Sequence, residues 1–181
     1  RVVGSGFVEV WGPVDALPVE QAAAFKKYKA LLSKGALAGA NPGHGREVFE
    51  KTCSSCHKLY EKGGLIGPDI TGANRTNIDY LLGNILTPSA IIQDAYRMQM
   101  VLMRDGRLYS GIPAVESERV LELRVANQEK PVALAKSQIA SREIAPVSMM
   151  PEGLLANLSD AEVLDLVAYL QKLKQVPLPK K

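Results

Sequence analysis

Apolar residues recur at the spacing of an α-helix in four separate parts of the chain. The pattern predicts helices over residues 18–34, 44–57, 77–86 and 159–173. The fourth has the strongest start signal, because Ser159 and Glu162 have the spacing of a capping box. Its buried face is expected to extend to Leu173, and Pro177 and Pro179 follow as stop signals.

A different pattern, the alternation of apolar and polar residues, occupies residues 96–145. Met98 and Met100 alternate with polar neighbours, which favours core positions for both methionines. Asp105-Gly106 predicts a hairpin turn. Further short runs follow at residues 108–114, 121–125 and 132–135. The segment therefore predicts a small antiparallel β module, either a flat meander or a small barrel.

The remaining segments indicate how the chain is divided. Residues 1–17 predict a strand or an extended arm, and residues 35–43, rich in glycine and alanine, predict a linker. The N-terminal segment is either a helical extension that packs on the following domain or the tail of a preceding domain. We divide the chain into an N-terminal extension with its linker (1–41), a main domain (42–176) with the β module (96–145) inserted, and a C-terminal tail (177–181). The expected fold class is mainly α, with the β module as an insertion.

The strongest candidate for chemistry is Cys53-Ser54-Ser55-Cys56-His57, which contains both cysteines and one of the two histidines of the chain. Cys-x-x-Cys-His is the attachment sequence of c-type haem, in which each thiol forms a thioether and the histidine binds the iron. Residues three apart lie on one face of a helix, so both sulfurs are expected to face the same porphyrin edge. The motif predicts one haem c attached through Cys53 and Cys56, with His57 as iron ligand.

Three other uses of this motif agree less well with the sequence. A redox dithiol would be expected in a βαβ setting, which the flanking residues do not provide. A closed zinc site needs four ligands, and only His44 is left to join these three. A disulfide would close a very short loop and leave His57 unexplained.

The second iron ligand is expected to be a methionine, because histidine paired with methionine raises the reduction potential. All five methionines follow the haem motif. We choose Met150, since Pro151 restricts the backbone of the residue before it. Met149 is the main alternative, and either methionine also fits as a core filler. His44 is a weaker candidate, which together with His57 would give an iron bound by two histidines.

A glycine-rich loop follows the motif, and such a loop can lie close against a flat cofactor. Within it, the carbonyl oxygen of Pro68 is a candidate acceptor for the Nδ1–H of His57. Such a bond would hold the imidazole in one orientation and increase its donor strength. The alternative is that Pro68 is only a turn residue.

Composition limits the remaining possibilities. With 181 residues, 46% of them hydrophobic, the chain can bury the core of one domain, or of one domain with a small attachment. A net charge of +3 without a clustered basic face does not favour nucleic-acid binding. There is no apolar run long enough to cross a bilayer.

Because the chain begins at Arg1, we expect a processed or excised form. Covalent haem attachment and the lack of other cysteines favour the periplasm or another extracytoplasmic compartment.

Several segments together resemble the class I cytochromes c. They are Gly45–Phe49, Cys53–His57, Gly67–Gly72, Met150-Pro151 and Tyr169-Leu170. The resemblance implies that Phe49 and Tyr169 pack where the first and last helices of the domain cross. It also implies that the Pro68 carbonyl and the Met150 sulfur have the roles described above.

The sequence is most similar to the haem-binding domain of many planctomycete and verrucomicrobial proteins, over about residues 42–174. The shared segments are Gly67–Gly72, Thr87-Pro88-Ser89, Asp105-Gly106-Arg107 and Ser148–Leu154. Such domains often lie beside propeller-type dehydrogenase domains or helical repeats. The resemblance thus implies a redox protein as donor or acceptor, with a propeller-type dehydrogenase as one candidate.

The function expected from these residues is electron transfer without catalysis, by an iron that keeps His57 and Met150 bound. The β module would then cover the haem or form a docking face. One alternative is a haem sensor or peroxidase-like domain whose methionine dissociates, with Arg75 or Arg97 as distal polar groups. Another is an interaction module in which the haem is structural.

Overall fold

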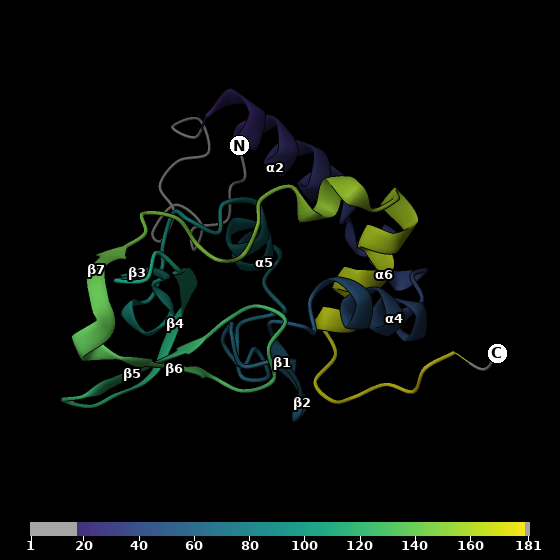
Figure 1. Cartoon of the computed structure of the whole chain (residues 1–181). Helices are drawn as coiled ribbons and strands as arrows, with labels where there is room; N and C mark the ends of the chain where they lie inside the picture. Colours follow the sequence, from purple (N-terminus) through teal and green to yellow (C-terminus); the bar gives the residue numbers. More distant parts are fainter. Residues whose placement is uncertain (1–17, 180–181) are drawn as a thin grey trace.

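The computed structural model describes residues 18–179, in which helices and strands separate into two parts (Figure 1). The helical part contains α2 (Val19–Leu31), α3 (Lys34–Ala38), α4 (Pro42–Thr52), α5 (Ile78–Leu86) and α6 (Asp160–Leu170). The β part contains β3 (Gln99–Met103), β4 (Leu108–Glu116), β5 (Val120–Arg124), β6 (Val132–Ala135) and β7 (Ile139–Ile144). Short elements complete the chain: the β1–β2 hairpin (Lys58–Leu59 and Lys62–Gly63) and the 3₁₀ turns η2 (Asp94–Tyr96), η3 (Lys136–Gln138) and η4 (Leu154–Asn157). The strand or arm expected for residues 1–17 lies outside the described residues.

The expected fold class, mainly α, is wrong. About 36% of the chain is helical and 20% is in strands, so the fold is mixed. The helices of the haem motif and of the C-terminus end earlier than the apolar spacing predicts, at Thr52 and Leu170. The inserted segment meanwhile forms a complete five-stranded sheet. A resemblance to an all-helical family therefore described only part of this chain.

The linker expected at residues 35–43 is also largely helical. Ser33 caps α3 by accepting a hydrogen bond from the Ala36 amide. Asn41 caps α4 by accepting bonds from two amides, and Pro42 occupies the first turn, where the lack of an N–H is tolerated. These caps offset the low helix propensity of the glycines in the segment.

The helical part is organised around the crossing of α4 and α6. Phe49 and Tyr169 meet there with ring centroids 5.6 Å apart. Gly45 makes the close approach possible, because a Cβ at this position would lie 1.8 Å from the Asp165 carbonyl oxygen. The Asp165 side chain accepts a hydrogen bond from the Asn41 amide at 2.6 Å. Packing of the helices and capping of α4 therefore depend on the same turn of α6.

The N-terminal helix α2 packs on this same core. Its aromatic residues Phe25 and Tyr28 are buried in one apolar cluster with residues of α4, α5 and α6. Lys29 forms an ion pair with the buried carboxylate of Asp79 in α5, at 2.5 Å. The extension therefore shares a core with the rest of the helical part.

The helix α6 begins as predicted but ends sooner. Ser159 and Glu162 form the complete capping box. The helix stops at Leu170, and Leu173 is 85% exposed, contrary to the expected buried face. The guanidinium of Arg75 explains the early end, because it donates hydrogen bonds to the carbonyls of Leu170 and Lys172.

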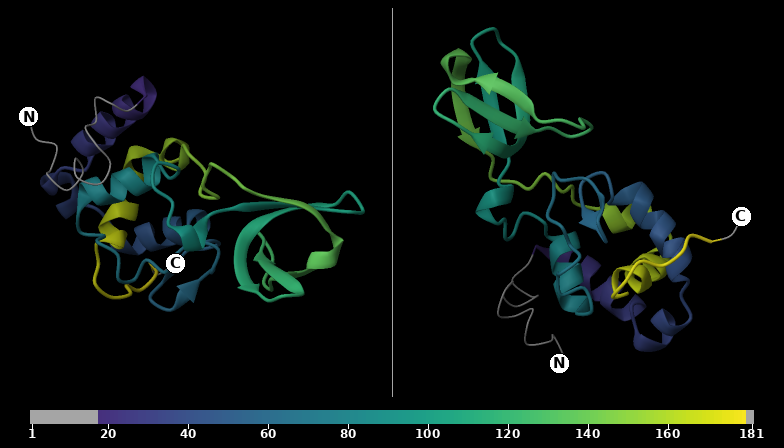
Figure 2. Two further views of the ribbon diagram at one scale, coloured as in Figure 1. Left: turned by 90° about the vertical axis from the view of Figure 1, so that its left-hand side faces the viewer. Right: turned by 90° about the horizontal axis from the view of Figure 1, so that it is seen from below.

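The β part is an antiparallel sheet with strand order β6-β5-β4-β3-β7. Its edge strands β6 and β7 are joined through η3, and Figure 2 shows the sheet strongly curved, nearer to a small barrel than to a flat meander. It has an apolar core of its own, formed by Val101, Met103, Leu121, Leu123 and Leu134. Met100 points outward and is 36% exposed, so the expectation that it lies in the core is wrong. Among residues 18–179, no helix has both the length and the apolar character needed to span a bilayer.

Candidate haem site

The Cys-x-x-Cys-His motif lies in a tight turn at the end of α4. The helix ends at Thr52, so the two cysteines do not share a helical face as expected. The amides of Cys56 and His57 both donate to the Cys53 carbonyl oxygen, at 3.1 and 2.9 Å. This turn, rather than a helix, brings the three side chains together.

The three side chains line a cavity of about 650 Å³, a size typical of sites for small molecules and cofactors. Pro68, Met149 and Met150 line the same cavity. Much of the rest of the wall is apolar and comes from α5 and the segment after it, including Leu81, Ile85 and Ile92. The structure therefore brings the two cysteines, His57, Pro68 and both candidate methionines around one space.

The imidazole of His57 is held from two directions. Its Nδ1 lies 3.0 Å from the carbonyl oxygen of Pro68. A Cβ at Gly67 would lie 2.7 Å from Cε1 of the ring, so only glycine leaves the ring its place. Burial lowers the pKa of His57, and the Pro68 hydrogen bond opposes part of this effect. The ring is thus kept neutral with Nε2 free, which is the form that binds a metal.

The thiol of Cys53 differs from that of a redox-active cysteine. Burial, with a smaller contribution from Cys56, raises the pKa of Cys53 to about 12. A redox-active cysteine needs a lowered pKa, because the thiolate is the nucleophile. The environment of Cys53 therefore does not favour the dithiol alternative.

The two candidate methionines follow a loop that is tied to the helical part. The amide of Ser148 donates to the Ser89 hydroxyl at 3.1 Å, and the Ser148 hydroxyl accepts from the Met150 amide at 3.1 Å. Met149 and Met150 both line the cavity and both are half-buried. The geometry of the protein alone does not choose between them.

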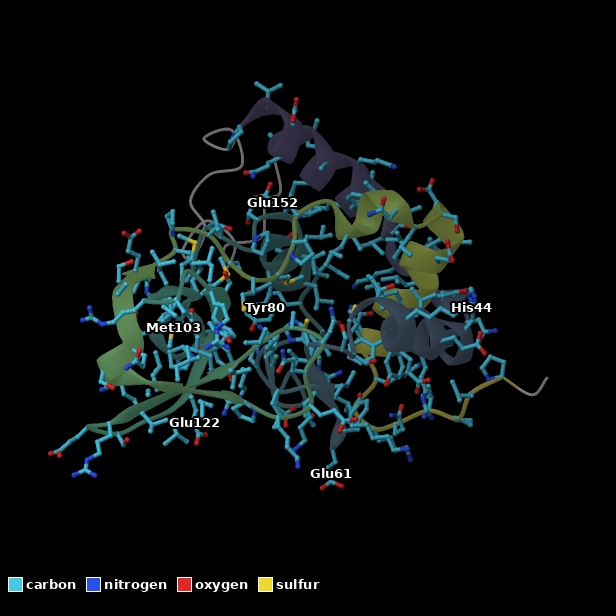
Figure 3. All side chains as sticks on the ribbon, in the orientation of Figure 1. His44, Glu61, Tyr80, Met103, Glu122 and Glu152 are labelled. Atoms are coloured by element: carbon cyan, nitrogen blue, oxygen red, sulfur yellow. The ribbon has the colours of Figure 1, made fainter. Side chains whose placement is uncertain are left out.

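His44 lies apart from this cavity. It sits in the first turn of α4, with Nδ1 2.7 Å from a carboxylate oxygen of Asp165. Figure 3 shows it near the right-hand edge of the molecule, well apart from Tyr80 of α5, which lines the cavity. Within the described range, His57 is the histidine that lines the cavity.

Residues 40–106 match the family described as cytochrome C oxidase, cbb3-type, subunit III. The match supports a c-type cytochrome. It covers the haem motif, Pro68, α5 and β3, and it ends before β4. No curated protein matches the sequence. A cytochrome c domain carries covalently bound haem c and functions in electron transport.

The side chain of Arg75 has a position in the cavity that the sequence did not reveal. Arg75 is 5% exposed and lines the cavity. Its Nη atoms donate to the Tyr60 hydroxyl and to main-chain carbonyls of Thr71, Leu170 and Lys172. Among the buried side-chain atoms of residues 18–179, Arg75 Nε has no hydrogen-bond partner. Burial of a donor without a partner is costly.

This unpartnered donor fits a haem. The two thiols match the vinyl groups, the free Nε2 of His57 matches the iron, and the cavity is mostly apolar like the porphyrin face. A haem propionate would supply the acceptor that Arg75 Nε lacks. The residues present therefore suit haem c. Most of the Arg75 donors already have partners, so Arg75 does not act as the free distal polar group of the sensor or peroxidase-like alternative.

Proposed function

We propose that this protein is a single-haem c-type cytochrome that carries electrons, with His57 and Met150 as axial ligands. The haem would supply reversible one-electron chemistry at iron. Cys53 and Cys56 hold it covalently, and His57 binds the metal through Nε2. The observation that carries the proposal is the convergence of both cysteines, His57 and the Met149-Met150 pair on one apolar cavity.

The protein's own contribution is a rigid and dry site. The Pro68 carbonyl orients the His57 ring and raises its basicity as a donor. The Ser89–Ser148 and Ser148–Met150 hydrogen bonds hold the methionine loop. Ligands that stay bound in both oxidation states keep the structural reorganisation that accompanies each electron transfer small. The protein thus transfers electrons without acting as an enzyme.

The setting of this function follows from the resemblance of residues 42–174 to the planctomycete and verrucomicrobial haem-binding domains. We infer an extracytoplasmic protein, because haem is attached to this motif outside the cytoplasm. Its partners are redox proteins, and a propeller-type dehydrogenase is the donor to test first.

Absorption spectroscopy of two matched variants tests the proposal. The wild-type protein should contain one covalent haem by mass and show the weak near-infrared band of a ferric iron–methionine bond. Met150→Ala should lose this band, and the reduced variant should bind carbon monoxide. Met149→Ala should keep the band and resist carbon monoxide. The reverse result would assign the ligand to Met149, and a wild-type protein without the band would refute ligation by methionine.

A further inference from the structure

One residue of the β part has a position that neither apolar core explains. Ile112 lies in β4, in which side chains alternate between the two faces of the sheet. Tyr109 packs against the core of the β part, and a Cβ on Gly111 would lie 3.1 Å from Cβ of Leu123 in that core. Because odd-numbered positions face this core, Ile112 lies on the opposite face of the sheet.

A residue on the outer face of a small sheet is normally exposed, yet Ile112 is only 1% exposed. It belongs to neither the helical core nor the core of the β part. Ile112 lines the cavity that contains His57, together with Tyr96 of η2. The insertion therefore contributes a wall of the haem cavity rather than forming a separate appendage.

This wall is held in place by hydrogen bonds between the two segments that connect the parts. The Ala145 amide donates to the Met98 carbonyl oxygen at 2.9 Å, and the Ser148 amide donates to the Ser89 hydroxyl at 3.1 Å. One segment enters the β part and the other leaves it. The same exit segment continues directly into Met149 and Met150. The β part and the methionine loop are thus fixed to the cavity as one unit.

We propose that Ile112 keeps water out of the haem cavity and thereby raises the reduction potential, an inference that rests on the proposed electron-carrier function. Ferric iron carries one more positive charge than ferrous iron, so water near the cavity stabilises the ferric state. A dry apolar wall disfavours that state and makes reduction easier. The insertion is then a determinant of the potential, through a side chain outside the ligand set.

Two substitutions of equal shape test the inference. Val and Thr differ by the exchange of a methyl group for a hydroxyl, so Ile112→Val and Ile112→Thr create similar space but different polarity. The midpoint potential of Ile112→Thr is expected to lie below that of Ile112→Val, while both keep the near-infrared band. The matched control is Val101→Thr, the same exchange in the core of the β part, where the side chain is fully buried but away from the cavity. It should lower stability and leave the potential at the wild-type value.

Equal potentials in the two Ile112 variants would overturn the inference. So would an equal drop in Val101→Thr, which would show that general loosening of the β part is responsible. If Ile112→Thr does not incorporate haem, Ile112→Ala takes its place and Val101→Ala becomes the control. A lower potential in Ile112→Ala alone supports the inference, and equal potentials in these two variants overturn it. A wild-type protein that lacks the near-infrared band would refute the proposed function itself, whereas a normal band with equal potentials refutes only the role of Ile112.

Discussion

The carbonyl oxygen of Pro68 lies 3.0 Å from Nδ1 of His57, while Gly67, the residue before it, lies directly against the same ring. One short segment therefore orients the imidazole and also leaves it space. The hydrogen bond determines which nitrogen is free, and the absence of a side chain at Gly67 determines where the ring can lie. Substitution at Gly67 is thus expected to act directly on His57, the proposed iron ligand.

Gly67→Ala should displace the His57 ring, because the new methyl group would lie 2.7 Å from Cε1. We expect less covalent haem per protein and a loss of stability of about 2 kcal/mol, the usual cost of overpacking. Absorption spectra and denaturant unfolding measure the two effects. Gly72→Ala, in the same loop but with no atom within 4 Å of the added methyl group, is the control and should resemble the wild type. Equal haem content in both variants would contradict the prediction.

Gly45→Ala should separate the helices α4 and α6, because its methyl group would meet the Asp165 carbonyl oxygen at 1.8 Å. The two nearest atoms are the carbonyl oxygen and carbon of Asp165, which belong to the main chain and have little freedom to move. We therefore expect a loss of about 3 kcal/mol in the free energy of unfolding. Urea titration measures it. Gly39→Ala adds the same group next to the Ala36 carbonyl oxygen at 3.8 Å, an ordinary contact, and should change stability by less than about 0.5 kcal/mol. A Gly45→Ala protein of wild-type stability would show that the crossing is less tight than the structure indicates.

Arg75→Lys should destabilise the protein even though the charge is retained. Lysine has a single ammonium group and cannot reproduce the planar fork that serves the Tyr60 hydroxyl and the carbonyl groups at the end of α6. Leaving buried carbonyls without donors is expected to cost about 3 kcal/mol. Chemical denaturation is the measurement, and Arg119→Lys, at an exposed position of the β part, is the control. Similar stabilities of the two variants would argue against a structural role of the guanidinium.

Glu116 gives the β part a pH-dependent contribution to stability. Hydrogen bonds from Arg142 and Lys136 lower the pKa of Glu116 to about 2. A carboxyl group whose pKa is lower in the folded than in the unfolded state stabilises the fold above its unfolded pKa. That contribution is lost as the pH falls toward the folded pKa. Glu116→Gln should therefore lower the melting temperature at neutral pH, and the difference from the wild type should shrink between pH 4.5 and pH 2.

The control for this prediction is Glu118→Gln, which removes an exposed carboxylate two residues away. It should leave the melting temperature nearly unchanged at every pH, because isolated surface charges contribute little. Thermal unfolding of the three proteins across the pH range provides the comparison. A constant difference between Glu116→Gln and the wild type at all pH values would contradict a role for the ion pair.

Several features could be predicted from the sequence because they depend on residues close together in the chain. The capping box of Ser159 and Glu162 involves groups three residues apart. The β segment was recognisable from its alternation and from the Asp105-Gly106 turn. The haem motif itself occupies five consecutive residues.

Other features were missed because they depend on contacts between distant segments. Arg75 ends the helix α6 from 95 residues away, so the apolar spacing wrongly extended that helix to Leu173. Ile112 looks like an ordinary strand residue, and nothing near it in the chain shows that the outer face of β4 is covered. Both Met149 and Met150 line the cavity, so the protein's own geometry does not choose between them.

The sequence by itself determined the candidate covalent chemistry of this protein, because the two thiols for thioether attachment and the histidine for the iron lie within five consecutive residues. The tertiary structure decided which residues form the walls of the cavity. The physical reason is that hydrogen-bond caps and strand alternation act over a few residues. Exclusion of water requires surfaces that meet only when the helical part and the β insertion fold against each other.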